Sequence, residues 1–165
     1  MATYLIVGAG AIGTVVAEEL AARGQTVRLL SRRGTGPEHE LIERVAGDAS
    51  DAATVTRHAK GAAAVFNCAN PAYHRWPTDW PPIANALLGA AEVSGAGLVT
   101  LNNLYAYGQP TGPMTPHDPL SATYEKAQVR ATMWHDAKRA HDEGRVRATE
   151  VRASDFIGPR SESYL

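Results

Sequence analysis

Three glycines with the spacing G-x-G-x-x-G follow directly on a short apolar run near the start of the chain. The run, Tyr4 to Val7, is continuously apolar, which is typical of a strand that is buried on both faces of a parallel sheet. From Ala11 to Arg23, apolar residues recur at four-residue steps, and this periodicity predicts a helix. A strand that turns through glycines straight into a helix is the opening unit of a layered α/β sheet.

Strands and helices alternate along the rest of the chain. Apolar runs predict strands over residues 26–30, 41–46, 63–66, 97–101 and 147–152, and helical periodicity predicts helices over 51–59, 82–95 and 123–143. Four prolines between residues 108 and 120 exclude a helix there and predict an extended loop. We therefore expect one α/β domain over residues 1–165, a doubly wound parallel sheet (Rossmann fold) of about six strands.

Composition excludes several classes of protein. Sixteen Lys and Arg against 17 Asp and Glu give a net charge of −1, which argues against nucleic acid and anionic lipid as partners. The single cysteine excludes an internal disulfide framework and suits a reducing compartment, so we expect a cytoplasmic protein. No apolar run approaches the roughly 18 residues of a membrane span. His135 and His141 are six positions apart on one predicted helix, so no metal site is expected.

The glycine turn predicts a dinucleotide site. Gly8 permits the tight turn, Gly10 lets the backbone approach a pyrophosphate, and Gly13 lets helix and strand pack closely. Ala11 and Ile12, at the start of the helix, offer backbone N–H groups at the positive end of the helix dipole. The alternative is an ordinary strand-to-helix turn made of small residues.

The second strand ends in Ser31, Arg32 and Arg33, where NAD-binding folds of this kind carry an acidic residue for the adenosine ribose. A carboxylate would repel a 2′-phosphate, whereas a hydroxyl beside guanidinium groups can bind one through charge-assisted hydrogen bonds. The sequence therefore favours NADP(H), with NAD(H) as the less favoured cofactor. In the alternative interpretation both arginines are solvated loop charges.

Two further segments fall where a bound dinucleotide would pass. Asp48, followed by Ala49, comes after the third strand and can accept a hydrogen bond from an adenine amino group, or it can cap the next helix. Cys68, Ala69 and Asn70 follow the fourth strand, on the way to the nicotinamide half. Cys68 itself is expected to be a small packed thiol, because no base is adjacent in sequence.

Five segments taken together carry a family resemblance. They are Gly8–Gly13, Gly47-Asp48, Asn67–Asn70, Leu101–Gly108 and Arg152–Pro159. Over nearly the whole chain they resemble the NAD(P)-dependent epimerase/dehydratase family, the extended short-chain dehydrogenase/reductases. The fourth segment resembles that family's S-S-x-x-V-Y-G sequence, and the fifth resembles its R-P-x-x-V-Y-G-P sequence.

The resemblance implies a catalytic set that this chain has altered. Family members use a Ser or Thr that holds the substrate oxygen, a Tyr that moves its proton, and a Lys four residues later that binds the nicotinamide ribose. Counting back from Arg152 places Asn103, Lys126 and Arg130 at these three positions.

The replacements imply their own roles. Asn103 can donate to a substrate oxygen, Arg130 can donate to ribose hydroxyls, and Lys126 can replace the acid/base. A rival source of the proton is a phenol, that of Tyr105, Tyr107 or Tyr124. The alternative for Lys126 and Arg130 is an ordinary solvated helix face, since charges four residues apart are often no more than that.

Three aromatic side chains stand in the predicted loop after the fourth strand, Tyr73, Trp76 and Trp80. They can form an aromatic wall over the nicotinamide-side pocket, bury themselves against a partner subunit, or pack in the core. The sequence leaves these three alternatives open.

The expected function is that of an NADP(H)-dependent oxidoreductase or epimerase-like enzyme acting on a small hydroxyl or carbonyl substrate. A second hypothesis is a dinucleotide-binding sensor or regulatory module without turnover, because the Ser, Tyr and Lys set is lost. A third is the cofactor-binding part of a longer polypeptide, because family members carry a C-terminal substrate lobe after the R-P-x-x-V-Y-G-P segment. The resemblance also implies a homodimer through the helices that flank the fifth strand.

Overall fold

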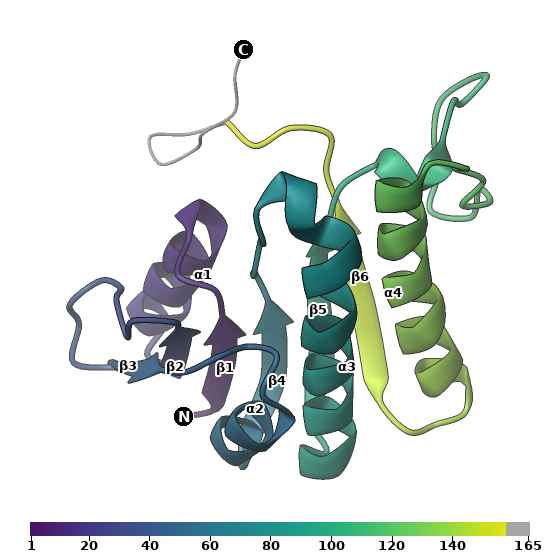
Figure 1. Ribbon diagram of the computed structural model, residues 1–165. Coiled ribbons are helices and arrows are strands. Elements are labelled where there is room, and N and C mark those ends of the chain that lie inside the picture. Colours follow the sequence, from purple (N-terminus) through teal and green to yellow (C-terminus); the bar gives the residue numbers. More distant parts are fainter. Residues whose placement is uncertain (158–165) are drawn as a thin grey trace.

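The computed structural model describes residues 1–157 and contains a six-stranded parallel sheet (Figure 1). The strands are β1 (Thr3–Val7), β2 (Thr26–Ser31), β3 (Ile42–Ala46), β4 (Ala62–Asn67), β5 (Gly97–Asn102) and β6 (Arg147–Arg152). Their order across the sheet is β3-β2-β1-β4-β5-β6, and every neighbouring pair is parallel. The predicted doubly wound α/β fold is confirmed.

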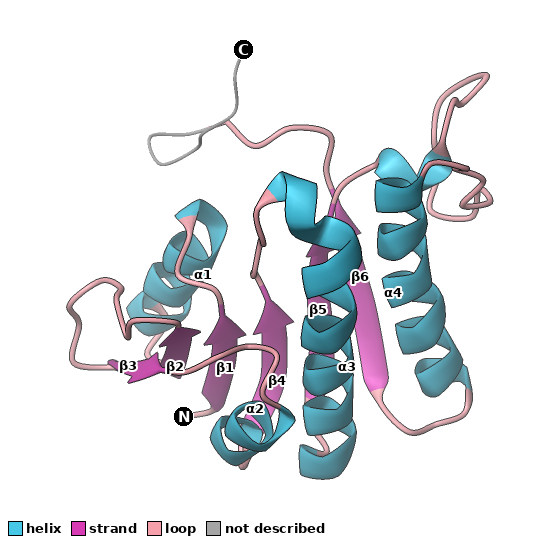
Figure 2. Cartoon of the chain, in the orientation of Figure 1, coloured by secondary structure: helices cyan, strands magenta, loops and turns pink. Residues whose placement is uncertain are grey.

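Helices cover both faces of the sheet (Figure 2). Helix α1 (Ala11–Ala22) packs on one face, where its small residues meet Ile6, Val27 and Leu29. Helices α2 (Ala52–Ala59), α3 (Trp76–Ser94) and α4 (Glu125–Asp142) lie on the other face and enclose the larger core. This two-sided cover explains why β1 is continuously apolar, with Leu5, Ile6 and Val7 at most 1% exposed.

The strand order reverses between β1 and β4. The chain runs outward in one direction from β1 to β3 and in the other from β4 to β6, so the connections after β1 and β4 diverge to opposite faces. At their carboxyl ends the backbones stay close, because the N–H of Cys68 donates to Val7 O at 2.9 Å and the N–H of Gly8 donates to Leu30 O at 2.8 Å. This reversal places the glycine turn at the point where open α/β sheets bind ligands.

Helix α3 differs most from the sequence prediction. It begins at Trp76, preceded by the short 3-10 helix η1 (Tyr73–Arg75), and not near Pro82 as predicted. A proline inside a helix costs about 3 kcal/mol because it removes a backbone hydrogen bond. Trp76 and Trp80 are only 6% and 0% exposed. Burial of a large apolar side chain contributes roughly 1.5–3 kcal/mol to stability, and this gain offsets the cost of the prolines.

The remaining boundaries fall within two residues of those predicted. Helix α4 begins at Glu125 and not at residue 123, and α2 begins at Ala52 because Asp51 is its N-cap. Residues 108–120 contain neither helix nor strand, as their prolines predict, and follow a second 3-10 helix, η2 (Tyr105–Tyr107). Among residues 1–157, no helix combines the length and the apolar character that crossing a bilayer requires.

Candidate functional site

The glycine turn after β1 is fixed by its own packing. Gly8 has a φ of 107°, and a Cβ there would lie 2.5 Å from the carbonyl oxygen of Cys68. A Cβ on Gly13 would lie 1.8 Å from the carbonyl oxygen of Gly8. Gly10 differs from both, since its φ is −79° and an added Cβ would meet no protein atom within 4 Å. Two glycines are therefore needed for the fold, whereas the third faces open space.

No side chain caps the N–H groups at the amino end of α1. Gly10 is the N-cap, and no acidic residue stands in the first turn. Helix geometry leaves the N–H groups of Ala11, Ile12 and Gly13 without intrahelical acceptors. Free N–H groups, a positive dipole end and an open approach at Gly10 together fit a diphosphate.

A cleft of about 1000 Å³ runs along the carboxyl edge of the sheet from this turn. It brings together most of the residues predicted to bind the cofactor: Gly8, Gly10, Ser31, Arg32, Arg33, Asp48, Ala49, Cys68, Ala69 and Asn70. Ala11, Ile12 and Gly13 are not among the lining residues and lie in the helix start beside it. The candidate catalytic residues do not line the cleft.

The two arginines at the far end of the cleft are exposed, and neither forms an ion pair within residues 1–157. Ser31 is different, because its hydroxyl donates to Thr35 O at 3.1 Å and accepts from Thr35 N at 2.9 Å. The hydroxyl of Ser31 therefore closes a turn, while Ser31 itself lines the cleft, and its role toward a phosphate stays a prediction. Arg32 and Arg33 are the available donors.

Asp48 lies in the cleft and does not cap a helix. Its carboxylate accepts from the backbone N–H and the hydroxyl of Ser50, each at 2.8 Å. The backbone hydrogen bond and then the hydroxyl of Ser50 lower the pKa of Asp48. The cap of α2 is Asp51, which accepts from Ala53 N at 3.0 Å, so the capping interpretation of Asp48 is wrong.

Cys68 is partly buried beneath the glycine turn, and burial raises the pKa of its thiol to about 12. A thiol with that pKa is protonated at neutral pH, so it is not a nucleophile. The expectation of a packed thiol agrees with this position. Within the described part of the chain, no three His, Cys, Asp or Glu side chains gather as a metal site would require.

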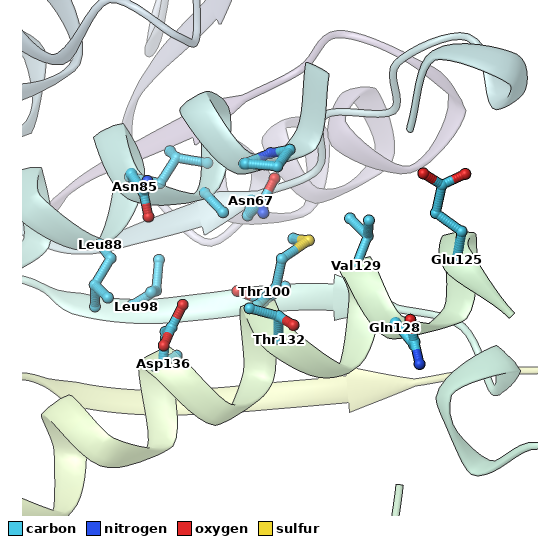
Figure 3. A pocket seen from close by; sticks show the side chains of 15 residues that line it. Asn67, Asn85, Leu88, Leu98, Thr100, Glu125, Gln128, Val129, Thr132 and Asp136 are labelled. Carbon is cyan, nitrogen blue, oxygen red and sulfur yellow. The ribbon is translucent and has the colours of Figure 1, made fainter. Parts of the chain in front are cut away.

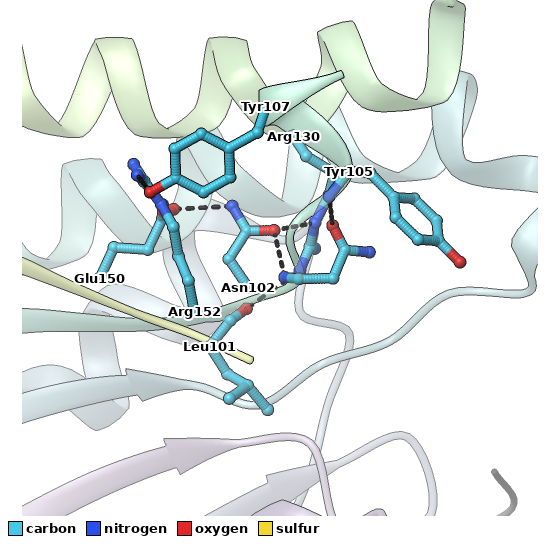
Figure 4. A network of polar contacts seen from close by, with 8 residues as sticks. Leu101, Asn102, Tyr105, Tyr107, Arg130, Glu150 and Arg152 are labelled. Carbon is cyan, nitrogen blue, oxygen red and sulfur yellow. Dashed lines mark hydrogen bonds and ion pairs between the residues drawn. The ribbon is translucent and has the colours of Figure 1, made fainter. Parts of the chain in front are cut away.

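Arg130 does not line the cleft, and its guanidinium is held in a polar network at β5 (Figure 4). It is 5% exposed, its Nε donates to Asn102 Oδ1 at 2.5 Å, and its Nη2 donates to Leu101 O at 3.0 Å. The guanidinium lies over the rings of Trp76 and Trp80, with its central carbon 5.1 Å and 4.5 Å from their centroids. The solvated-face alternative for Arg130 is therefore wrong, and Arg130 does not line the cleft in which the ribose-binding prediction would place it.

The cause is the early start of α3, which places both indole rings against α4. They are core residues, so of the three alternatives for the tryptophans the core interpretation holds. Burial lowers the pKa of Arg130 to about 10, opposed by the charge of Glu150. Arg130 Nη1 and Trp80 Nε1 are buried without a hydrogen-bond partner among the described residues.

A polar network continues from Arg130 across β5 and β6. Asn102 Nδ2 donates to Glu150 Oε2 at 2.7 Å, and Arg152 donates to Glu150 Oε1 at 2.5 Å and to the Tyr107 hydroxyl at 2.5 Å. Sequence reasoning missed Asn102 and Glu150. The sequence signal for Glu150 is the alternation of side chains along a strand. In β6, every second residue faces the helices, and Glu150 is one of these, with a side chain that is only 2% exposed.

The other candidate catalytic residues gather at the carboxyl end of β5. Asn103 Oδ1 accepts from Tyr105 N at 3.1 Å, which leaves its amide nitrogen as a donor. The Lys126 ammonium lies 3.5 Å from the centroid of the Tyr73 ring. The Tyr124 hydroxyl donates to Tyr105 O at 3.4 Å, and burial raises the pKa of Tyr124. The structure thus groups Tyr105, Tyr124 and Lys126, while Arg130 is separated from them by its burial.

Comparisons with known proteins agree with this architecture. The sequence model of the NAD dependent epimerase/dehydratase family matches residues 4–164. No curated protein matches the chain in sequence. Among solved structures, the Bordetella bronchiseptica enzyme WbmH in complex with NAD+ superposes with a TM-score of 0.85 at 22% identity, covering 99% of this chain and 59% of WbmH.

Two further structures are similar. UDP-glucose 4-epimerase from Brucella ovis, in complex with NAD, superposes with a TM-score of 0.79 at 22% identity. The superposition covers 94% of this chain and 52% of the Brucella epimerase. The dTDP-glucose 4,6-dehydratase DesIV from Streptomyces venezuelae, with NAD and TYD bound, has a TM-score of 0.83 at 20% identity, with 96% and 57% covered. This chain therefore spans somewhat more than half the length of these proteins.

Proposed function

Because the chain belongs to the NAD dependent epimerase/dehydratase family, we propose that its carboxyl-edge cleft binds a nicotinamide dinucleotide, with NADP(H) preferred over NAD(H). The observation that carries the proposal is the open approach at Gly10 in front of an uncapped helix. The similar structures of WbmH, the Brucella epimerase and DesIV all contain NAD, which supports the class of ligand.

We propose which part of the cofactor each end of the cleft would hold. The N–H groups at the start of α1 would hold the pyrophosphate. Arg32 and Arg33 line the cleft where the adenosine ribose would lie, and residues 31–37, directly after β2, contain no carboxylate to repel a 2′-phosphate. Asp48 would accept from the adenine amino group with an oxygen that Ser50 does not occupy, since both Ser50 hydrogen bonds go to Oδ1.

The reaction we propose is oxidoreduction, or an epimerisation that proceeds by it, on a small substrate with a hydroxyl or carbonyl group. A bound nicotinamide supplies or accepts the hydride. Asn103 would donate its amide nitrogen to the substrate oxygen, because Tyr105 N fixes which way that amide points. Lys126, or the phenol of Tyr124 or Tyr105, would move the proton.

One observation favours a second candidate function, dinucleotide binding without turnover. The residue at the family's lysine position, Arg130, is buried and bonded to Asn102 and Leu101. No cation from α4 therefore reaches the cleft at that position. A sensor or regulatory module would keep the glycine turn and the arginines and would not need that cation. The chain can also be the cofactor-binding part of a longer enzyme, since it spans 59% or less of the similar structures described above.

Calorimetric titration tests cofactor choice. We expect the wild-type protein to bind NADP+ more tightly than NAD+, and Arg32→Ala to weaken NADP+ binding by about tenfold or more while leaving NAD+ binding unchanged, because one charge-assisted bond is lost. Arg23→Ala is the matched control, since Arg23 is an exposed arginine at the opposite end of α1. Equal affinities for the two nucleotides in wild type would contradict the NADP preference.

Turnover is tested by following NADPH oxidation with a panel of aldehydes, ketones and sugar nucleotides. If the protein turns over, Lys126→Met, Tyr124→Phe and Tyr105→Phe separate the three candidate proton donors. Asn103→Ala should lower the rate by loss of a hydrogen bond to the substrate. Lys138→Met, on the exposed face of the same helix, is the control. Tight NADP+ binding with no turnover in wild type would favour the sensor.

A further inference from the structure

A third arginine, Arg75, lines the dinucleotide cleft together with Arg32 and Arg33. It comes from a different part of the chain, since it is the last residue of η1 and the N-cap of α3. Among the described residues that line the cleft, these three arginines are the only basic side chains. The function proposed above uses two of them and gives Arg75 no role.

The backbone that carries Arg75 is fixed on both sides. Arg75 N donates to Ala72 O at 2.8 Å. The indole of the next residue, Trp76, donates to Pro71 O at 3.0 Å, and Trp76 is buried. Because this neighbour is part of the core, the Arg75 side chain starts from a fixed point at the edge of the cleft.

Asp79 holds the guanidinium of Arg75 by one edge. Arg75 Nε donates to Asp79 Oδ2 and Arg75 Nη2 donates to Asp79 Oδ1, each at 2.8 Å. These hydrogen bonds raise the pKa of Arg75 and lower the pKa of Asp79, so both groups are charged at neutral pH. A guanidinium has five N–H donors, and Nη1 takes no part in this ion pair. The pair therefore orients the group and leaves donors for a ligand.

A bound pyrophosphate needs more positive charge than α1 supplies. The amino end of a helix is equivalent to about half a positive charge, whereas each phosphate group of a pyrophosphate carries a negative charge. Arg32 and Arg33 directly follow β2, where the adenosine ribose and its 2′-phosphate would lie. Arg75 is the remaining basic side chain of the cleft, and a planar guanidinium matches phosphate oxygens.

Arg75 is separate from the groove between α3 and α4 (Figure 3). That groove contains Asn85 and Val129, and its lining shares no residue with that of the cleft. The groove lies on the pair of helices through which the family resemblance implies a homodimer. Arg75 and Asp79 line the cleft at the carboxyl edge of the sheet instead, so the two surfaces are distinct.

We propose that Arg75 binds the pyrophosphate of the dinucleotide, in addition to the N–H groups at the start of α1. Asp79 holds one edge of the guanidinium, and Nη1 donates to a phosphate oxygen. This inference rests on the proposed function, since it concerns the same cleft. Because NAD(H) and NADP(H) share the pyrophosphate, Arg75 contributes equally to the binding of both, whereas Arg32 contributes only to that of NADP(H).

Calorimetric titrations of the 165-residue chain with NADP+, NAD+ and adenosine 2′-monophosphate separate the phosphate groups. Arg75→Gln should weaken the binding of NADP+ and of NAD+ by the same factor, about tenfold, as expected for one charge-assisted hydrogen bond. It should leave the binding of adenosine 2′-monophosphate unchanged, because that nucleotide has no pyrophosphate. Arg75→Lys keeps the charge without the planar group and should lose less affinity than Arg75→Gln.

Arg23→Gln is the matched control for Arg75→Gln. Arg23 forms the same kind of ion pair, with a carboxylate four residues away on a helix, at the end of α1 that is remote from the glycine turn. Its replacement should leave the affinity for all three nucleotides unchanged.

Phosphorus NMR adds a readout that the loss of a surface ion pair would not change. With each protein saturated with NADP+, we expect the pyrophosphate resonances of the bound nucleotide to differ between wild type and Arg75→Gln. The 2′-phosphate resonance should stay in place, because its proposed partners, Arg32 and Arg33, are unchanged.

Two results would overturn this inference and leave the proposed function intact. Equal affinities of Arg75→Gln and Arg23→Gln for NADP+ would mean that Arg75 is only the ion-pair partner of Asp79. A loss of NADP+ affinity with unchanged NAD+ affinity would mean that Arg75 binds the 2′-phosphate. If the wild-type protein binds neither NADP+ nor NAD+, the proposed function fails and this inference fails with it, so the two failures are distinguishable.

Discussion

The side chain of Asn102 links Arg130 to the carboxylate of Glu150 by hydrogen bonds. Arg130 Nε donates to Asn102 Oδ1 at 2.5 Å, and Asn102 Nδ2 donates in turn to Glu150 Oε2 at 2.7 Å (Figure 4). One neutral amide thus connects a buried cation to a buried anion. Asn102 Oδ1 also accepts from Asn103 N at 2.8 Å, so the same side chain holds the start of the candidate catalytic loop.

Replacing that amide should cost more than replacing the cation. Asn102→Leu removes the shared partner of both charges, and we expect a loss of about 3 kcal/mol in the free energy of unfolding. Arg130→Met, of similar length and without a charge to desolvate, should cost about 1 kcal/mol or less. The double variant should therefore be more stable than Asn102→Leu alone. Urea unfolding measures all three, and strictly additive losses would contradict the coupling.

Two glycines of the turn allow stability and dinucleotide binding to be tested separately, since Gly13 is needed for packing and Gly10 faces open space. Gly13→Ala should destabilise the protein by about 2–4 kcal/mol, because its Cβ would lie 1.8 Å from a backbone oxygen that cannot move cheaply. Gly10→Ala should leave stability unchanged or raise it by about 0.5 kcal/mol, since φ is ordinary and the Cβ meets no protein atom. The same methyl should lower dinucleotide affinity by about tenfold or more, by keeping the pyrophosphate from the backbone.

Thermal unfolding of the two glycine variants, with and without NADP+, provides the comparison. A stable Gly10→Ala protein that binds the nucleotide as tightly as wild type would show that the open space before α1 is not where the ligand sits.

The sequence was sufficient to predict the layered fold. Continuous apolar strands, glycine caps and the turn at Gly8 are local signals, and each agrees with the sheet that forms. The start of α3 could not be read in the same way, because prolines 81 and 82 argue locally against a helix. Tertiary burial of Trp76 and Trp80 decides it, and burial depends on partners from α4 that a local window does not contain.

The cofactor side of the site was predictable for the same reason and the catalytic side was not. Gly10, Arg32 and Asp48 follow strand ends, so their place at one edge of the sheet follows from topology. The direction in which the Arg130 side chain points does not follow from its position in the sequence of α4. It depends on the two tryptophans of α3, which contact the guanidinium only in the folded protein. The same unforeseen contact explains why Asn102 and Glu150 were missed.

The thiol of Cys68 should be slow to react. Burial raises its pKa to about 12, from 9.0 for a free thiol, so the thiolate is scarce near neutral pH. Because Cys68 is the only cysteine, labelling with a disulfide reagent reports on it alone. We expect a labelling rate at least about 100-fold below that of the urea-unfolded chain. Labelling of the folded protein at the unfolded rate would show that the turn above Cys68 opens freely.

The same shift gives a pH dependence of known sign. A thiol whose pKa is higher in the folded protein binds its proton more tightly there, so its contribution to stability is complete below about pH 9 and is lost as the pH rises toward the folded pKa. The difference in unfolding free energy between wild type and Cys68→Ala should shrink above about pH 9, by at most about 1.4 kcal/mol per pH unit. Subtracting the variant removes the titration of tyrosines and lysines. A constant difference would mean that the thiol titrates normally.

In the proposed complex, the uncapped amino end of α1 holds the pyrophosphate of a nicotinamide dinucleotide. Amide-resolved NMR during titration with NADP+ tests it most directly. We expect the amide resonances of Ala11, Ile12 and Gly13 to move downfield together and to saturate with a single dissociation constant, because each N–H gains a negatively charged acceptor. If the resonances of these three amides stay in place at saturating NADP+ while resonances elsewhere shift, the nucleotide binds at another site and the amino end of α1 does not hold its pyrophosphate.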